Sequence, residues 1–591
     1  MKTNDKLQAL RNKMKEAKVD VYYVPTADPH MSEYVTPAYQ ARAWLSGFTG
    51  SAGQAVVSQS EAKVWTDGRY YIQAAKELAG SEFTLMKAGT PHVPKVQDYL
   101  LDCLPEKGVL AANGWTIAQK EVDFLQSRLR EGQTLRLDLE LVEAIWTDRP
   151  ELPHSEAFLL DEKYSGRRTQ KKLEGLREAL ADEEADYALI GKLDDIAWLY
   201  NIRGGDVKST PVLLSYALVG KQKAYFFVDD TKLGEEVRKA LETDGVEIRT
   251  YEEISDVLSE LNIQKIWLDK RFVNAAVYRS IPEQVQVVDK SDWTSLEKAL
   301  KNTTEIANQK VAYIKDGIAV TRLMHWLKSH EDISSIDELG VSRTLLGFRE
   351  ELEHFIEESF TTIAAYGANA AMMHYAPTEG NKANLQESGF LLVDSGGQYL
   401  EGTTDTTRTF ALGTLTDEEK TDYTLCLKGH IGLARAVFLK GTPGYYLDSL
   451  ARQPLWQHRM DYKSGTGHGV GYLLSVHEGP HGVSRAYNSQ ALEPGMVVTN
   501  EPGVYKEGKH GIRLENTYYV VEDQYVEPDQ YLAFENFTMV PFDRDAIDVG
   551  LLERFEIEWV NSYHTMVYET LKSYVSDSVR TWLEQACAPI A

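Results

Sequence analysis

The sequence predicts three consecutive domains: two related α/β domains, followed by one α+β domain. Its 591 residues exceed what one hydrophobic core holds, since domains contain roughly 100–200 residues each. One order of helix, strand and glycine-rich turn occurs at the start of the chain and returns after residue 165. Beyond residue 302 the pattern changes to longer amphipathic helices separated by strands. We therefore expect domains at 1–150, 151–302 and 303–591.

The first domain begins with an amphipathic helix and a strand. Leu7, Leu10 and Met14 recur at helical spacing, and the apolar segment 19–24 predicts a strand that ends before a proline. Glycine-rich turns and short alternating strands follow, and the last of these strands ends in the run WTDGRY at residues 65–70. This succession is typical of a small α/β domain.

The second domain repeats that order weakly but consistently. Leu173 and Leu176 lie on one helix face, and Asp186 begins a strand. Further on, the segment 225–230 mirrors the segment 63–67 of the first domain. Because the order of elements is kept, we interpret the two as related domains. A polar run containing two prolines indicates a linker between them.

The third domain is marked by two helix starts. Asn302 and Glu305 form a capping-box pattern, and Thr416 and Glu419 form a second one. Strands are predicted at 390–393, 496–499 and 516–521, and helices close the chain over 546–591. Helices combined with such strands make an α+β domain.

Composition restricts the function classes. The chain has 63 basic and 89 acidic residues, a formal charge of −26, and such a surface repels nucleic acid and anionic membranes. Three distant cysteines without a CxxC pair support neither a disulfide framework nor a thiolate zinc site. The first 20 residues lack the apolar core of a signal peptide, and no run of about 18 apolar residues predicts a membrane helix. We expect a cytoplasmic protein.

Acidic side chains at strand edges carry the chemistry of the third domain. Asp394 ends the apolar run 390–393, and Asp405 lies in the polar strand that follows a glycine turn. Glu501, Glu515 and His468 each adjoin an apolar or glycine-rich segment: TNEPG, IRLEN and GTGHGVG, respectively. Taken singly, each of these residues is more often a cap, a turn or a structural residue. Four carboxylates and one imidazole in one domain instead predict a metal site.

Two divalent ions suit this set of side chains. Four carboxylates balance two dications and leave a bridging water to be acidified to hydroxide. Oxygen-rich ligation with a single imidazole favours Mn²⁺ over the zinc sites rich in nitrogen and sulfur. We therefore expect two divalent ions, with Mn²⁺ as the most suitable.

One motif in this domain is misleading. The run from His477 to His481 matches the HExxH pattern of zinc proteases, which requires both histidines on one helix face. Gly479 and Pro480 lie between them, and a proline alone costs a helix about 3 kcal/mol. We reject a helical zinc motif here.

The residues around these positions resemble those of the pita-bread metallopeptidases, the family of methionine aminopeptidase, prolidase and aminopeptidase P. The runs VDSGGQYLEGTTDTTRT, GTGHGVG, VHEGPHG, TNEPGVY and GIRLEN are similar to those of aminopeptidase P. The similarity continues outside the third domain in SGFTGSAG, WTDGRYYIQAAK, IWTDRPELP and DDIAWLYNIRG. The resemblance implies two creatinase-like α/β domains followed by a pita-bread catalytic domain, as in the three-domain cytosolic form.

The resemblance also implies roles for the metal ligands. Asp394 would hold one ion, and His468 and Glu501 would hold the other. Asp405 and Glu515 would bridge the two ions. Glu501 would in addition take the proton of the attacking water as general base.

Further residues would contact the substrate, by the same resemblance. His477 and His374 would hold the peptide and stabilise the tetrahedral oxyanion. Arg69 of the first domain would touch the peptide, and His468 borders the same pocket. Tyr505 and Arg513 match positions that shape a proline pocket, although simple packing or a structural ion pair stays open for both. The implied substrate is a peptide with proline as second residue, and the implied assembly is a homodimer.

One position departs from the family pattern. The residue four before the ligand histidine is commonly His, whereas this chain has Ser464. Since serine reaches less far and carries no charge, we hypothesise weaker binding or an altered preference.

Three alternatives stay open at this stage. A prolidase would cleave only Xaa-Pro dipeptides, and the additional α/β domain argues against it. A creatinase-like amidinohydrolase or a non-catalytic peptide-binding scaffold of the same fold would need no metal. The complete ligand set argues against both of these.

Overall fold

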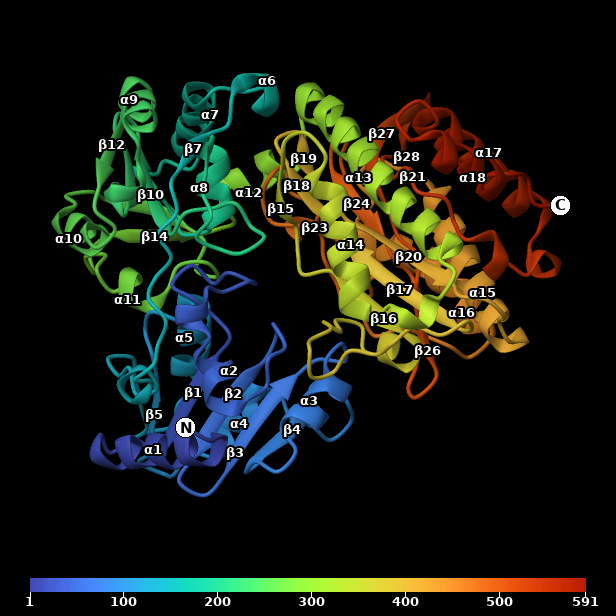
Figure 1. Cartoon of the computed structure of the whole chain (residues 1–591). Coiled ribbons are helices and arrows are strands. Elements are labelled where there is room, and N and C mark those ends of the chain that lie inside the picture. The colour runs from blue at the N-terminus through green and yellow to red at the C-terminus, as the bar shows by residue number, and fades with distance from the viewer. The chain divides into compact units, whose positions relative to one another are not determined.

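The computed structural model describes residues 1–591 as two compact units (Figure 1). One unit comprises Met1–Asp161 and Arg167–Ser295, and the other comprises Glu162–Gly166 and Leu296–Ala591. The first unit holds both predicted α/β domains, and the second holds the predicted α+β domain. The three boundaries inferred from the sequence stay predictions. No helix of the structure is both long and apolar enough to cross a membrane.

The first unit contains a six-stranded mixed sheet in its N-terminal half. The strand order is β4-β3-β2-β1-β5-β6, with β1 antiparallel to β2 and parallel to β5. The strands are β1 (Val21–Pro25), β2 (Gln54–Ser58), β3 (Ala62–Thr66), β4 (Phe83–Lys87), β5 (Val109–Ala112) and β6 (Thr134–Arg136). The helices are α1 (Thr3–Glu16), α2 (Ala41–Ser46), α3 (Tyr71–Glu77), α4 (Val96–Asp102) and α5 (Gln119–Arg128). Leu7, Leu10 and Met14 of α1 are buried, as their spacing predicts.

A second six-stranded sheet in the same unit repeats this topology. Its order is β12-β11-β10-β8-β13-β14, again with an antiparallel pair next to the first strand and a parallel pair on the other side. The strands are β8 (Tyr187–Ile190), β10 (Ser215–Gly220), β11 (Ala224–Val228), β12 (Val246–Arg249), β13 (Lys265–Leu268) and β14 (Gln286–Asp289). The helices between Thr169 and Ala299 are α7 (Thr169–Asp182), α8 (Leu193–Leu199), α9 (Glu235–Thr243), α10 (Glu253–Glu260), α11 (Ala275–Tyr278) and α12 (Trp293–Ala299). The equivalent strand orders confirm the repeat inferred from the sequence.

The second unit builds short sheets under long helices. Its sheets are β16-β17-β20, β21-β28-β27-β24, β15-β18-β19, β22-β23 and β25-β26. The central strands are β16 (Ile363–Tyr366), β17 (Phe390–Ser395), β20 (Thr406–Ala411), β24 (Val497–Asn500), β27 (Asn516–Val526) and β28 (Asp529–Asn536). The outer strands are β15 (Phe355–Glu358), β18 (Gly397–Tyr399), β19 (Gly402–Thr403), β21 (Val437–Leu439), β22 (Gly467–Gly469), β23 (Glu478–Val483), β25 (Gly503–Lys506) and β26 (His510–Arg513).

Helices cover both faces of the central strands in this unit. Leu391 and Val393 of β17 belong to a core with α13 and α14, while Phe390 packs in a second core with α15 and α17. This alternation follows from the two-residue period of a strand buried on both faces. The helices are α13 (Thr303–Ser329), α14 (Glu338–Glu350), α15 (Asp417–Ala434), α16 (Gly444–Gln457), α17 (Arg554–Leu571) and α18 (Asp577–Ala586). Both predicted capping boxes are present, at the starts of α13 and α15.

Candidate metal centre

Strand pairing gathers three of the predicted carboxylates. β17 lies antiparallel to β20, so that Asp394 pairs with Thr407. The predicted return of the chain from Asp394 to Asp405 is present, and it includes the short strands β18 and β19. Glu515, between β26 and β27, donates its N–H to the Thr407 carbonyl at 3.1 Å. Its carboxylate accepts the Thr407 hydroxyl at 2.7 Å.

The histidine of the predicted set lies on the β22–β23 hairpin. His468 donates Nδ1–H to the carbonyl of Gly469 at 2.8 Å, because a carbonyl can only accept. In the neutral imidazole Nε2 then carries the lone pair, and this atom lies 3.4 Å from a carboxylate oxygen of Asp405 and of Glu501. Gly467 allows β22 to lie close to β24, since a Cβ at this position would collide with the Thr499 carbonyl of β24. The imidazole is oriented as a metal ligand requires.

Electrostatic repulsion among the carboxylates is the main feature of the site. Burial raises the pKa of Asp394, Glu501 and Glu515, and the charge of Asp405 raises them further. Arg513 pairs with only one of them, from Nη2 to Asp394 Oδ2 at 2.5 Å. Asp394 Oδ1 is buried and accepts no hydrogen bond. Buried carboxylates so arranged need additional positive charge.

The donor set fits divalent cations. Asp405, His468 and Glu515 each offer one ligand atom, and these atoms all lie within 4.8 Å of one another. Burial lowers the pKa of His468, but the neighbouring carboxylates outweigh burial and raise it to about 9. A proton on the imidazole thus does electrostatically what a cation would do, and a metal ion would displace it. Oxygen donors with one nitrogen suit Mn²⁺ and similar hard ions.

The residues expected to contact the substrate are distributed over several segments. The ring of His477 stands nearly perpendicular to that of His468, with centroids 4.3 Å apart. Arg513 donates Nη1–H to the Tyr505 hydroxyl at 2.7 Å while it holds Asp394. His374 lies in the segment between β16 and β17, after the 3₁₀ turn Gly367–Ala371.

Arg69 belongs to the first unit. Its guanidinium makes two bonds to Asp67, from Nε at 2.9 Å and from Nη2 at 2.8 Å. Such a paired, planar guanidinium is rigid, which suits recognition of a carboxylate or a peptide carbonyl. Its contact with peptide stays a prediction.

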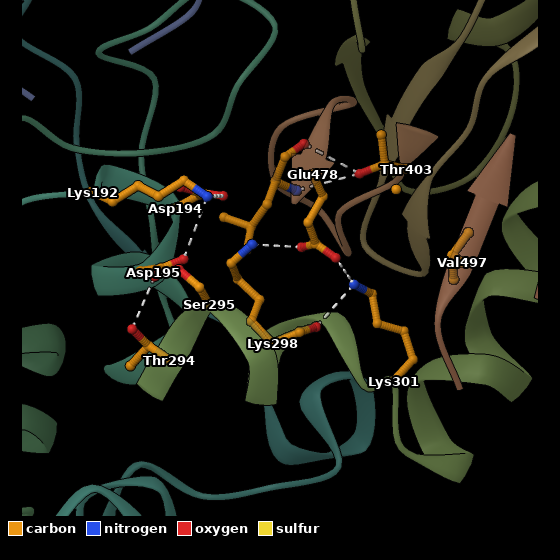
Figure 2. Close-up of polar contacts among 12 residues, drawn as sticks. Lys192, Asp194, Asp195, Thr294, Ser295, Lys298, Lys301, Thr403, Glu478 and Val497 are labelled. Carbon is orange, nitrogen blue, oxygen red and sulfur yellow. Dashed lines mark hydrogen bonds and ion pairs between the residues drawn. The ribbon is translucent and has the colours of Figure 1, made fainter. Parts of the chain in front are cut away.

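Sequence reasoning missed the side chains that support the His477 hairpin. Glu478 lies in β23, which confirms the rejection of a helical HExxH motif. Its carboxylate is buried between two buried lysines, with Lys298 Nζ at 2.6 Å from Oε2 and Lys301 Nζ on Oε1 (Figure 2). The lysines precede Glu478 by 180 and 177 residues, so no local pattern could reveal the pairing.

The fold and these residues together define a metallopeptidase of the pita-bread type. The model of metallopeptidase family M24 matches residues 307–522, and a model of the C-terminal region of peptidase M24 matches 530–590. Two models of creatinase/prolidase N-terminal domains match 6–143 and 148–305. The predicted fold class, two creatinase-like domains before a pita-bread domain, is confirmed.

Individual relatives identify the family within this class of metallopeptidases. A probable Xaa-Pro aminopeptidase P from Tuber melanosporum is 40% identical, spanning 100% of this chain and 99% of the relative. One from Coprinopsis cinerea is 38% identical over 100% of this chain and 98% of the relative. A crystal structure of X-prolyl aminopeptidase from Caenorhabditis elegans, described as a cytosolic enzyme with a di-nuclear active site, is 34% identical. That structure has a TM-score of 0.94 and full coverage of both chains. This chain belongs to the Xaa-Pro aminopeptidase P family.

Proposed function

We propose that this chain removes the N-terminal residue from peptides whose second residue is proline. The observation that carries the proposal is the cluster of four carboxylates, three of them buried, with His468 Nε2 facing two of them. Family membership over the whole length supports the choice of substrate class.

The proposed metal ligands are the five residues predicted from the sequence. They are Asp394, Asp405, His468, Glu501 and Glu515. Two divalent ions bound by them would lower the pKa of a water and polarise the scissile carbonyl. We propose Mn²⁺ as the ion because the donors are mainly carboxylate oxygens.

Side chains of the protein carry out proton transfer, oxyanion stabilisation and recognition of proline. Glu501 would accept the proton of the attacking water as general base. His477 and His374 donate to the carbonyl oxygen as negative charge develops on it. Arg513 holds Asp394 and Tyr505 in place, and the tyrosine borders the pocket for the pyrrolidine ring. Proline has no N–H, so a fitted pocket replaces the lost hydrogen bond.

The proposed oligomeric state and cell compartment rest on the same family resemblance. We propose a homodimer that works in the cytoplasm on peptides. The description of the C. elegans structure as a cytosolic enzyme supports the compartment.

Product analysis tests the proposal. Peptides of the Arg-Pro-Pro type and Xaa-Pro dipeptides are incubated with the protein, with Mn²⁺ and after chelation. Release of one N-terminal residue from the longer peptides, lost on chelation and restored by Mn²⁺, is expected. Cleavage of dipeptides alone would identify a prolidase instead. No cleavage with Mn²⁺, Co²⁺ or Zn²⁺ would leave a peptide-binding scaffold.

A further inference from the structure

A buried glutamate on α14 contacts the loop that carries His374. Glu338 is the first residue of α14, directly after the N-cap Asp337, and its side chain is fully buried. The loop at residues 367–383 connects β16 to the segment before β17 and has only one short 3₁₀ turn. A loop without regular structure needs bonds from elsewhere to hold a side chain in one place.

Neutral donors from the two ends and the middle of this loop converge on the Glu338 carboxylate. Oε1 accepts the N–H of Tyr366 at 2.6 Å and the amide of Asn369 at 3.0 Å. Oε2 accepts the Tyr375 hydroxyl at 2.8 Å and the N–H of Ala383 at 2.8 Å. An ionised carboxylate accepts about four hydrogen bonds, so these donors match its capacity.

The backbone completes the attachment at the far end of the loop. Glu338 donates its own N–H to the carbonyl of Ala383 at 3.1 Å, while its carboxylate accepts the N–H of Ala383. Two residues further on, Leu385 donates its N–H to Ile336 at 2.9 Å. The end of the loop is thereby fixed to the first turn of α14.

His374 has bonded neighbours on both sides. The carbonyl of Met373 accepts Arg513 Nη2 at 3.3 Å, and Arg513 also holds Asp394. The hydroxyl of Tyr375 binds Glu338. Since a residue between two anchored neighbours has little freedom, the position of its side chain depends on both bonds.

We propose that Glu338 is a positioning residue for catalysis, which fixes His374 against the substrate by binding the last residue of β16 and three residues of the loop. The assignment rests on the proposed function, because His374 is taken to contact the peptide. A glutamine at this position would turn one acceptor oxygen into an NH₂ that faces N–H and O–H donors. The loop would then shift, and a misplacement of about 1 Å costs catalysis about 100-fold.

A double-mutant cycle on the metal-loaded enzyme tests the proposal. We expect Glu338→Gln to lower kcat/KM for an Arg-Pro-Pro peptide by about 10–100-fold, mainly through kcat. His374→Ala causes a comparable loss. If Glu338 acts through His374, Glu338→Gln causes little further loss in the His374→Ala background. Independent, multiplying losses would overturn the proposal.

Further variants keep the test decisive if Glu338→Gln folds poorly. Tyr375→Phe removes one of the four bonds and should give a smaller fall in kcat with the same non-additivity. Asp206→Asn is the matched control, since Asp206 is a buried carboxylate of the first unit paired with Lys232. It should leave kcat unchanged. Loss of activity in the control equal to that of Tyr375→Phe would contradict a specific role of the loop.

A readout without substrate separates this proposal from the proposed function. Limited proteolysis should cut residues 367–383 faster in Glu338→Gln than in the parent and in Asp206→Asn. If the parent cleaves no Xaa-Pro peptide, the proposed function fails, while faster cutting still supports Glu338 as the anchor of the loop. Equal cutting rates in all three proteins would overturn the anchor itself.

Discussion

Two segments of the second unit present histidines, and buried carboxylates hold them in different ways. The β22–β23 hairpin carries His468 and His477 and is held by Glu478, which pairs with Lys298 and Lys301 (Figure 2). The loop at residues 367–383 is held by Glu338, whose partners are neutral donors. The hairpin is held by ion pairs of opposite charge. The loop is held by hydrogen bonds from neutral donors that point at the Glu338 carboxylate. Removal of one partner should therefore affect them differently.

The hairpin cluster depends on charge. Glu478 retains a pKa below its usual value because its two lysines outweigh the cost of burial. Burial lowers the pKa of Lys301, and the charge of the neighbouring Lys298 lowers it further. Cross-strand pairing places Glu478 opposite Gly469, the residue after the proposed ligand His468. The charge cluster thus supports the strand that presents the imidazole.

The largest expected effect is that of Glu478→Gln. The change leaves two buried lysines without a counter-charge, and breaking a buried ion pair in this way costs about 3–5 kcal/mol of unfolding free energy. Urea unfolding of the metal-loaded protein measures it. Lys301→Met is the matched control because it leaves one lysine for one carboxylate. A loss as large for Lys301→Met would show that packing, and not charge, holds the hairpin.

The second largest effect is expected on metal removal, which should change hydrogen exchange in the hairpin but not in the loop. His468 is a proposed ligand, so chelation should lower the protection of its N–H, which donates to Thr499 Oγ1 at 3.0 Å. With metal at 100 times its Kd, binding stabilises the site by about 2.7 kcal/mol. The N–H groups of Tyr366 and Ala383 bind Glu338 and should keep their protection. Hydrogen exchange with and without chelator measures this, and equal losses in both segments would remove the distinction.

Removal of a single neutral donor to Glu338 should have a smaller effect on the loop. Tyr375→Phe deletes the hydroxyl that lies 2.8 Å from both Glu338 Oε2 and the carbonyl of Asn381. The loss of a hydrogen bond to an ionised group costs about 1.5 kcal/mol locally. The three other bonds to Glu338 remain, so the loop should loosen around Tyr375 and not detach. Exchange of the Ala383 N–H should quicken while that of Tyr366 changes less. Uniform quickening along the loop would show that its anchors act as one cooperative unit.

The sequence indicated the proposed metal ligands but not the residues that support them. Asp394 and Glu515 interrupt or border apolar strands, and an acidic residue there is costly enough to be conspicuous. Glu338 gives no such signal, because an acidic residue in the first turn of a helix is ordinary. Glu478 was conspicuous only through a motif that its strand excludes. Its lysine partners depend on tertiary packing across more than 170 residues.

Periodicity predicted the elements to within a few residues. The strand expected at 19–24 is Val21–Pro25, and the strand expected at 496–499 is Val497–Asn500. The repeat of the two α/β domains was visible as a weak order of elements, and the sheets share that order in full. Their association into one compact unit was not predictable, since it depends on contacts distant in sequence.

The smallest expected effect concerns Ser464, near the start of the hairpin. Its hydroxyl is buried and makes no hydrogen bond, while its carbonyl accepts Arg452 Nη2 at 2.8 Å. The fold thus makes its hydrogen bond at this residue through the backbone and not through the side chain. We expect Ser464→His to lower KM for Xaa-Pro peptides by about 3–10-fold, or about 0.7–1.4 kcal/mol, with stability nearly unchanged. KM values over a set of first residues measure the effect. An unchanged profile would mean that serine is equivalent to histidine at this position.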